Sequence, residues 1–159
     1  MFIRSASRTD FDNVSVLIEA AFGQHDEALL VSELRADGDM ALEFVATDRD
    51  VVVGHVALST MKSPARCLAL APVSVDPLRH GKGIGSALIR VANEAAEEAD
   101  WTAIFVLGNP AYYGRFGYEV AQAAAFDTPF PSEFTAVCVF DDEDFTTLPT
   151  ELIYPRAFL

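Results

Sequence analysis

The segment VSVDPLRHGKGIGSALI, residues 73–89, carries the strongest structural signal in the sequence. Gly81, Gly83 and Gly85 stand at alternate positions after an apolar, strand-like run and lead directly into an amphipathic helical pattern. Glycines let the backbone approach a ligand closely, and the free N–H groups and positive dipole end of a helix attract anions. The segment therefore predicts a phosphate or pyrophosphate site, to which Lys82 adds a positive charge.

Two other phosphate loops do not fit this segment. A Walker A loop requires Gly-x4-Gly-Lys-Ser/Thr, and Gly81-Lys82-Gly83 lacks both the spacing and the hydroxyl. A dinucleotide fingerprint requires Gly-x-Gly-x-x-Gly, and Leu88 stands where its third glycine belongs. A helix-opening turn without a ligand is the remaining alternative.

The elements on both sides of the turn predict a mixed α/β fold. We expect strands at residues 2–6, 42–47, 51–60, 67–75, 101–107 and 135–140, and helices from Thr9 or Asp10 to Phe22, from His25 to Arg35, over 84–99 and from Asn109-Pro110. A further strand closes the sheet, and the acidic run at 141–144 is expected to be a solvated loop. Three consecutive strands among helices exclude a simple alternating parallel fold. No repeat or linker interrupts the chain, so we expect a single domain over residues 1–159.

The amino-acid composition limits the classes of partner that the protein can bind. The net charge of −13 argues against nucleic acid and anionic membranes, whose phosphates require clustered Lys and Arg. The acidic surface either attracts a basic acceptor or serves solubility.

No apolar run reaches the roughly 18 residues that span a bilayer, and the N-terminus resembles no secretory signal. Cys67 and Cys138 are expected to be buried free thiols, which favours a cytoplasmic location, and the sequence predicts no metal site.

The glycine segment resembles the acyl-CoA-binding motif of the GNAT acyltransferase superfamily. That motif is Gln/Arg-x-x-Gly-x-Gly/Ala after an extended Val-x-Pro, here Val75-Asp76-Pro77, and His80 occupies the Gln/Arg position. The resemblance implies a GNAT-like, mostly antiparallel central sheet flanked by helices, with splayed central strands. It also implies acetyl-CoA as the donor.

The resemblance assigns main-chain contacts to the cofactor. Pro72 donates no ladder hydrogen bond, so we expect a bulge or a local break in pairing there, with a proline-tolerating edge strand as the alternative. In the GNAT fold this strand pairs with the pantetheine arm, and an N–H there can stabilise the tetrahedral oxyanion. The cofactor-binding residues that the resemblance implies are Val73, Ser74, Val75, His80, Gly81, Lys82, Gly83, Ile84, Gly85 and Ser86.

A second segment, GNPAYYGRFGY at residues 108–118, is similar to the GNAT Tyr-x-x-x-Gly-Phe signature. The resemblance implies that Tyr113 is catalytic and protonates the departing CoA thiolate, since a phenol near pKa 10 lies close to a thiol near 8.5. Tyr112 is the weaker candidate, and both tyrosines packing as ordinary aromatic side chains is the alternative. Asn109 is expected to cap the helix. Arg115 has either a structural role or a role near the phosphates, and the sequence leaves both open.

The acceptor must lose a proton before it attacks. His55 and Glu27 are candidate bases, although a satisfied, half-buried histidine is the favoured interpretation of His55, and the helix dipole alone explains a carboxylate at the helix start where Glu27 lies. We expect direct transfer of acetyl to a primary amine of a small molecule or peptide. A non-catalytic acyl-CoA-binding module is the main alternative, and an ATP- or NAD-binding protein is a weaker one. The sequence does not decide the oligomeric state, and a homodimer is one open alternative.

Overall fold

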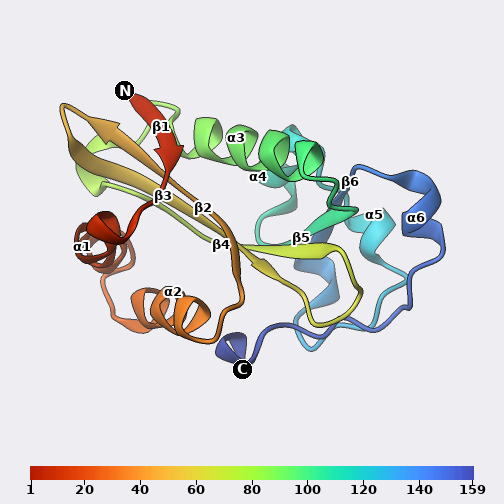
Figure 1. Ribbon diagram of the computed structural model, residues 1–159. Helices are drawn as coiled ribbons and strands as arrows, with labels where there is room; N and C mark the ends of the chain where they lie inside the picture. The colour runs from red at the N-terminus through yellow and green to blue at the C-terminus, as the bar shows by residue number, and fades with distance from the viewer. The chain divides into compact units, whose positions relative to one another are not determined.

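The computed structural model describes all residues, 1–159, and the chain forms two compact units. Unit 1 comprises Met1–Leu58 and Pro72–Ala92, and unit 2 comprises Ser59–Ala71 and Asn93–Leu159. Six strands form one sheet in the order β1-β2-β3-β4-β5-β6 (Figure 1). The predicted mixed α/β architecture, with a mostly antiparallel sheet and flanking helices, is confirmed. No helix combines the length and the apolar character that crossing a bilayer requires.

Unit 1 is built on a β-hairpin. Strand β1 (Phe2–Ser5) pairs antiparallel with β2 (Met40–Asp48), which continues through a tight turn into β3 (Val51–Thr60). The two turn residues, Arg49 and Asp50, have φ values of 49° and 67°. Two consecutive left-handed residues give the turn a twist that matches the right-handed twist of the strands. The hairpin predicted across this turn is confirmed.

Helices cover both faces of this hairpin (Figure 1). Helices α1 (Phe11–Phe22) and α2 (Asp26–Ala36) pack on one face, where Val14, Val45 and Ala57 share a buried cluster. The first half of α3 (Ile84–Glu98) packs on the other face. There an ideal Cβ on Gly54 would lie 2.8 Å from Ile84 Cγ2, so glycine is what allows α3 to lie this close to β3.

Strand β4 (Cys67–Val75) carries one extra residue relative to β3. Met61 N donates to Cys67 O over 3.0 Å at one end, and Asp76 N donates to Val53 O over 2.9 Å at the other. Between the two bonds the chain advances eight residues along β3 and its end, from Val53 to Met61, but nine along β4 and its end, from Cys67 to Asp76. One extra residue on one strand is the mark of a β-bulge. Pro72 lies within that interval and cannot donate, in agreement with the bulge expected there.

Unit 2 contains the rest of the sheet. Strand β5 (Ala103–Leu107) pairs parallel with β4 from Cys67–Ala103 to Leu70–Val106 and antiparallel with β6 (Thr135–Val139). The parallel register thus ends two residues before Pro72. Short helices surround the strands: α4 (Pro110–Tyr113), α5 (Val120–Ala123) and α6 (Asp142–Thr146). Single 3-10 turns occur at Arg8–Asp10, Pro77–Arg79, Gly114–Phe116, Ser132–Phe134 and Arg156–Phe158.

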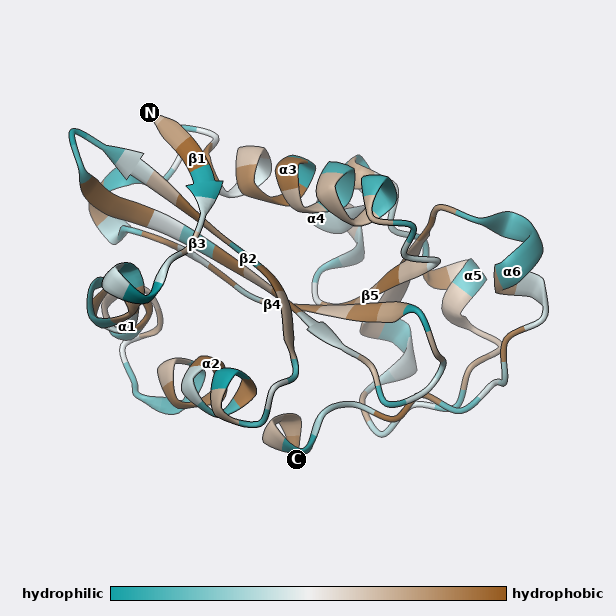
Figure 2. Cartoon of the chain, in the orientation of Figure 1, coloured by the Kyte–Doolittle hydropathy of each residue, from teal (hydrophilic) through white to brown (hydrophobic).

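Two expectations for the C-terminal part were wrong. The predicted closing strand is replaced by isolated bridges, in which Asp127 pairs with Glu151 and Ser63 with Ile153. The acidic run is helical, because Asp141 accepts a hydrogen bond from Asp144 N and caps α6. Negative charge in the first turn also favours this helix. In Figure 2, α6 is hydrophilic, while much of β5 is hydrophobic.

Candidate active site

The glycine turn lies in unit 1 and has the backbone geometry of an anion-binding nest. Gly81 and Gly83 both have φ of +78°, and no heavy atom lies within 4 Å of an ideal Cβ on either. Helix α3 begins at Ile84, directly after them. Alternating left-handed residues turn successive N–H groups toward one concave side, and the helix start adds its positive dipole end. The turn is therefore open and shaped to receive an anionic group.

The charged side chains beside the turn divide into two groups. Arg79 is held by the protein itself, since its Nη1 lies 2.5 Å from Asp48 Oδ2 and its Nε lies 3.6 Å from Asp76 Oδ2. The hydrogen bond from Arg79 lowers the pKa of Asp48 below its usual value. His80 and Lys82 are exposed. Lys82 is thus the cation of the turn that remains available for a phosphate.

The end of β4 leads into this turn. Val73 and Val75 are half-buried, whereas Ser74 is 1% exposed and its hydroxyl has no hydrogen-bond partner. Asp76 then accepts a hydrogen bond from Leu78 N and caps the 3-10 turn that precedes the glycines. The main chain of residues 73–75 and the glycine turn therefore form one continuous segment of unit 1.

Tyr113 lies in unit 2, at the end of α4. Asn109 accepts a hydrogen bond from Ala111 N and caps this helix, as predicted. An ideal Cβ on Gly108 would lie 2.4 Å from Tyr113 Cε2, so the tyrosine ring occupies space that only glycine leaves free. Burial, together with the neighbouring Tyr112, raises the pKa of Tyr113 to about 12. The phenol is therefore fully protonated near neutral pH.

The other aromatic residues of this segment pack against one another. Tyr118 donates a hydrogen bond to Asn93 Oδ1 over 2.7 Å, and its ring meets that of Tyr113 edge to face. The Arg115 guanidinium lies 5.5 Å from the ring centroids of both Tyr112 and Phe116. These distances are typical of cation–π contacts, which favour the structural role for Arg115.

The two candidate bases have different surroundings. Glu27 lies in the first turn of α2 and accepts hydrogen bonds from the exposed Gln24 side chain. His55 is fully buried, with Nε2 2.7 Å from Glu43 Oε2 and Nδ1 without any partner. The histidine is therefore more deeply buried than the sequence predicted, and only one of its two ring nitrogens is satisfied. Glu43 belongs to no local motif that would single it out in the sequence, because it comes from β2 while His55 comes from β3.

The cysteines do not offer a nucleophile. Cys67 and Cys138 are free and buried, as predicted. Burial raises the pKa of Cys67 to about 12 and that of Cys138 to about 11. Since the thiolate is the reactive form, both thiols are inert near neutral pH.

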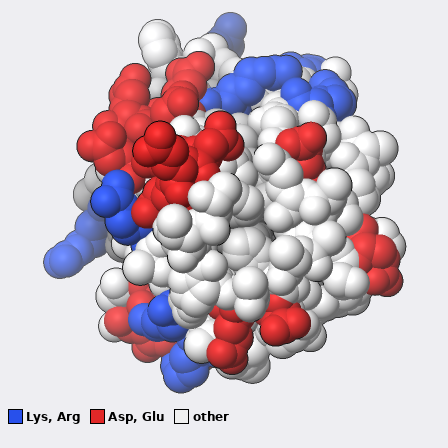
Figure 3. All heavy atoms as spheres, turned by 90° about the vertical axis from the view of Figure 1, so that its right-hand side faces the viewer, with Lys and Arg blue, Asp and Glu red and all other residues white.

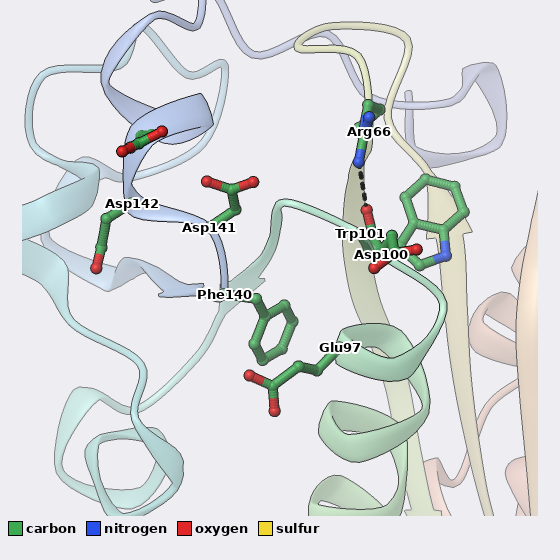
Figure 4. A pocket seen from close by; sticks show the side chains of 8 residues that line it. Arg66, Glu97, Asp100, Trp101, Phe140, Asp141 and Asp142 are labelled. Atoms are coloured by element: carbon green, nitrogen blue, oxygen red, sulfur yellow. Dashed lines mark hydrogen bonds between the residues drawn. The ribbon is translucent and has the colours of Figure 1, made fainter.

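A pocket of about 480 Å³ in unit 2 has none of the predicted site residues in its lining. Acidic side chains gather on this side of the chain (Figure 3). In Figure 4, Asp141 and Asp142 from the start of α6 lie across the pocket from Glu97 of α3, while Arg66 donates to the Asp100 carbonyl. The carboxylates at the start of α6 are explained by its helix dipole. The full lining is Arg66, Glu97, Asp100, Trp101, Phe140, Asp141, Asp142 and Glu143.

Comparisons with known proteins place this geometry in a family. Residues 41–120 match the family model described as an acetyltransferase (GNAT) domain. The uncharacterized N-acetyltransferase YhbS of Escherichia coli K12 is 35% identical over 125 residues, covering 76% of this chain and 75% of YhbS. The uncharacterized N-acetyltransferase YjhQ from the same strain is 32% identical over 133 residues, covering 78% and 73% of the two chains.

Solved structures agree with the sequence comparisons. The crystal structure of E. coli YhbS in complex with CoA has a TM-score of 0.91 at 29% identity, covering 99% of this chain and 91% of that one. A Brucella melitensis GNAT acetyltransferase in complex with acetyl-CoA has a TM-score of 0.84 at 28% identity, covering 99% and 97%. The matching family model, the curated relatives and these two structures show that the chain belongs to the GNAT family of acetyltransferases.

Proposed function

We propose that residues 1–159 act as one N-acetyltransferase domain that moves acetyl from acetyl-CoA to a primary amine by direct transfer. The observation that carries this proposal is the open pair of left-handed glycines, Gly81 and Gly83, immediately before α3. Such a nest suits the diphosphate of CoA, because its N–H groups and the helix dipole both favour a compact anion. The relatives solved with CoA and acetyl-CoA support this donor.

In this proposal the diphosphate contacts residues 80–86, with Lys82 as the free cation, and the pantetheine arm pairs with the main chain of residues 73–75. An N–H of that strand polarises the thioester carbonyl. Tyr113 donates a hydrogen bond to the departing sulfur. Its pKa of about 12 lies above that of a thiol near 8.5, so complete proton transfer from the phenol to the thiolate is unfavourable. Stabilisation by a hydrogen bond is the role that this pKa supports.

Direct transfer follows from the state of the cysteines. A covalent acetyl-enzyme requires an accessible thiolate, and both thiols are buried with raised pKa values. Their retention as free thiols also supports a cytoplasmic location. The acceptor is proposed to be a small-molecule or peptide amine, since the net charge of −13 favours cationic partners over phosphate-rich ones.

Two measurements test the proposal. Thermal unfolding with CoA, ATP or NAD should show stabilisation by CoA alone, because a ligand that binds only the folded state raises its stability. Thiol release from acetyl-CoA, followed with a thiol reagent, should then depend on an added amine, and the buried cysteines should keep the background low. Stabilisation by CoA without release across a broad amine panel would contradict catalysis and leave a binding module. Equal stabilisation by all three nucleotides would contradict the donor site.

A further inference from the structure

Arg79 stands two residues before the glycine turn, yet its side chain is bound to the protein's own carboxylates. Its Nη1 lies 2.5 Å from Asp48 Oδ2, and its Nε lies 3.6 Å from Asp76 Oδ2. A guanidinium is well suited to bind phosphate, because its fork donates two parallel hydrogen bonds. Here, however, the guanidinium and the two carboxylates together carry one net negative charge. This group of side chains offers no attraction to a phosphate, so its place beside the turn requires another explanation.

The two carboxylates come from different parts of unit 1. Asp48 is the last residue of β2, and Asp76 directly follows β4. The main chain of Asp76 is fixed to β3, since its N–H donates to Val53 O over 2.9 Å. The main chain of Arg79 is fixed in turn to Asp76, since Arg79 N donates to Asp76 O over 2.8 Å. The 3-10 turn Pro77–Arg79 is thus tied to β3 by main-chain bonds and to β2 by the Arg79 side chain.

The glycine turn depends on its two ends for its shape. No heavy atom lies within 4 Å of an ideal Cβ on Gly81 or Gly83, so no packing on that side holds either residue. Glycine also adopts positive and negative φ with similar ease. At the C-terminal end, Ile84 is 6% exposed, and its Cγ2 lies 2.8 Å from an ideal Cβ on Gly54. Close packing therefore fixes this end, whereas the ion pairs of Arg79 fix the other.

We propose that Arg79 is a positioning residue for the CoA diphosphate: its ion pairs with Asp48 and Asp76 hold the entry of the glycine turn, and its guanidinium does not bind the phosphate. This inference rests on the diphosphate site of the proposed function. A turn that is already held in its binding conformation loses less conformational entropy when the ligand binds, so preorganisation increases affinity. Arg79 therefore acts on the KM for acetyl-CoA and not on the chemical step.

A direct contact between Arg79 and a phosphate makes the opposite prediction. If the guanidinium left Asp48 to bind CoA, that carboxylate would compete with the ligand, and its removal would strengthen binding. If Arg79 holds the turn, removal of the Asp48 charge weakens binding, although the site then carries less negative charge. A role in stability alone lowers the fraction of folded protein and therefore kcat, while KM stays unchanged. The direction of the Asp48 effect and its place in KM or kcat separate these three roles.

The test compares Asp48→Asn with Asp50→Asn as the matched control. Asp50 belongs to the same hairpin turn, and it is not one of the carboxylates that pair with Arg79. Its φ of 67° is a conformation that asparagine also accepts, so the control removes the same charge without touching the ion pairs. Titration calorimetry with CoA gives the affinity, thiol release with a reactive amine gives kcat and KM, and thermal unfolding confirms that the variants are folded.

We expect Asp48→Asn to bind CoA about 3- to 5-fold more weakly than Asp50→Asn, the size of effect that a partly exposed ion pair supports. The KM for acetyl-CoA should rise by the same factor, with kcat unchanged. Dephospho-CoA, which lacks the 3′-phosphate but keeps the diphosphate, should show the same factor. Arg79→Gln should also weaken binding, and adding Asp48→Asn to it should cause no further loss, because the ion pair is already absent.

Each other outcome contradicts the positioning role. It is wrong if Asp48→Asn binds CoA as tightly as Asp50→Asn or more tightly, or if the loss appears in kcat alone. A loss with CoA but not with dephospho-CoA would assign Arg79 to the 3′-phosphate instead. In these cases the diphosphate site still stands, provided that Gly83→Asp, which puts a carboxylate in the turn, weakens CoA binding. Wild-type affinity in a folded Gly83→Asp variant overturns both the site and the positioning role.

Discussion

Replacing Gly83 with aspartate tests where the diphosphate binds. Gly83 has φ of +78°, and no heavy atom lies within 4 Å of an ideal Cβ there. A side chain at this position therefore meets open space, and its cost in the free protein is confined to the left-handed backbone, about 1–2 kcal/mol. For a chain of 159 residues this lowers Tm by only a few degrees, so the variant should remain folded.

The effect on binding is electrostatic and larger. A carboxylate roughly 5 Å from a phosphate charge, at an effective dielectric of about 20, repels it by about 3 kcal/mol. That energy corresponds to roughly 100- to 200-fold weaker binding of CoA. Because part of this repulsion is screened by ions, the loss should shrink as salt is raised.

Gly83→Asn is the control, since asparagine has nearly the same shape as aspartate, accepts a left-handed backbone and carries no charge. Titration calorimetry with CoA at low and high salt compares the two variants, and thermal unfolding confirms that both are folded. We expect the asparagine variant to bind within a few-fold of wild type. Equal CoA affinities for the two variants would refute the placement of the diphosphate at this turn.

Three further predictions concern other parts of the chain. Tyr113→Phe should lower kcat with little change in CoA affinity, whereas turnover at the wild-type rate in the same assay would remove its role at the leaving sulfur. Gly54→Ala should destabilise the fold by about 1–3 kcal/mol in chemical denaturation, because its Cβ would lie 2.8 Å from one α3 side chain and 2.9 Å from another. The control is Gly114→Ala, whose Cβ meets nothing within 4 Å, and equal stabilities for the two variants would contradict the close approach of α3. Asp10 has a pKa far below its usual value, first because of the hydrogen bond from Arg4, so it stabilises the fold above pH about 4 and loses this effect as pH falls further. Asp10→Asn should be less stable than wild type at pH 7 and should lose less stability between pH 4 and pH 2, and parallel stability–pH curves would exclude this contribution.

Local patterns in the sequence were sufficient where neighbouring residues determine the backbone. The bounds predicted for β4 agree with the structure, and the cap at Asn109 is confirmed. The acidic run at 141–144 had a readable signal as well, since an aspartate before three further acidic residues is a typical helix start. The prediction of a solvated loop considered only the charge of this run and therefore did not include α6.

The buried ion network could not be predicted in the same way. Arg35, Glu43 and His55 come from α2, β2 and β3, and no short motif links them. The sequence showed a lone histidine in an apolar strand, for which a satisfied core position was a reasonable expectation. Its hydrogen bond to Glu43 and its free Nδ1 depend on how the strands pair and on which face the helices cover.

The sequence by itself therefore determined the family motif, the glycine turn and most of the element order, because backbone conformation and helix capping are set by adjacent residues. Only the tertiary structure decided which polar groups are buried and which of them lack partners. The β-bulge in β4, for example, shifts the pairing register against β3 by one residue, and it becomes visible only where the two strands pair. Burial and pairing of this kind result from contacts between segments that are distant along the chain.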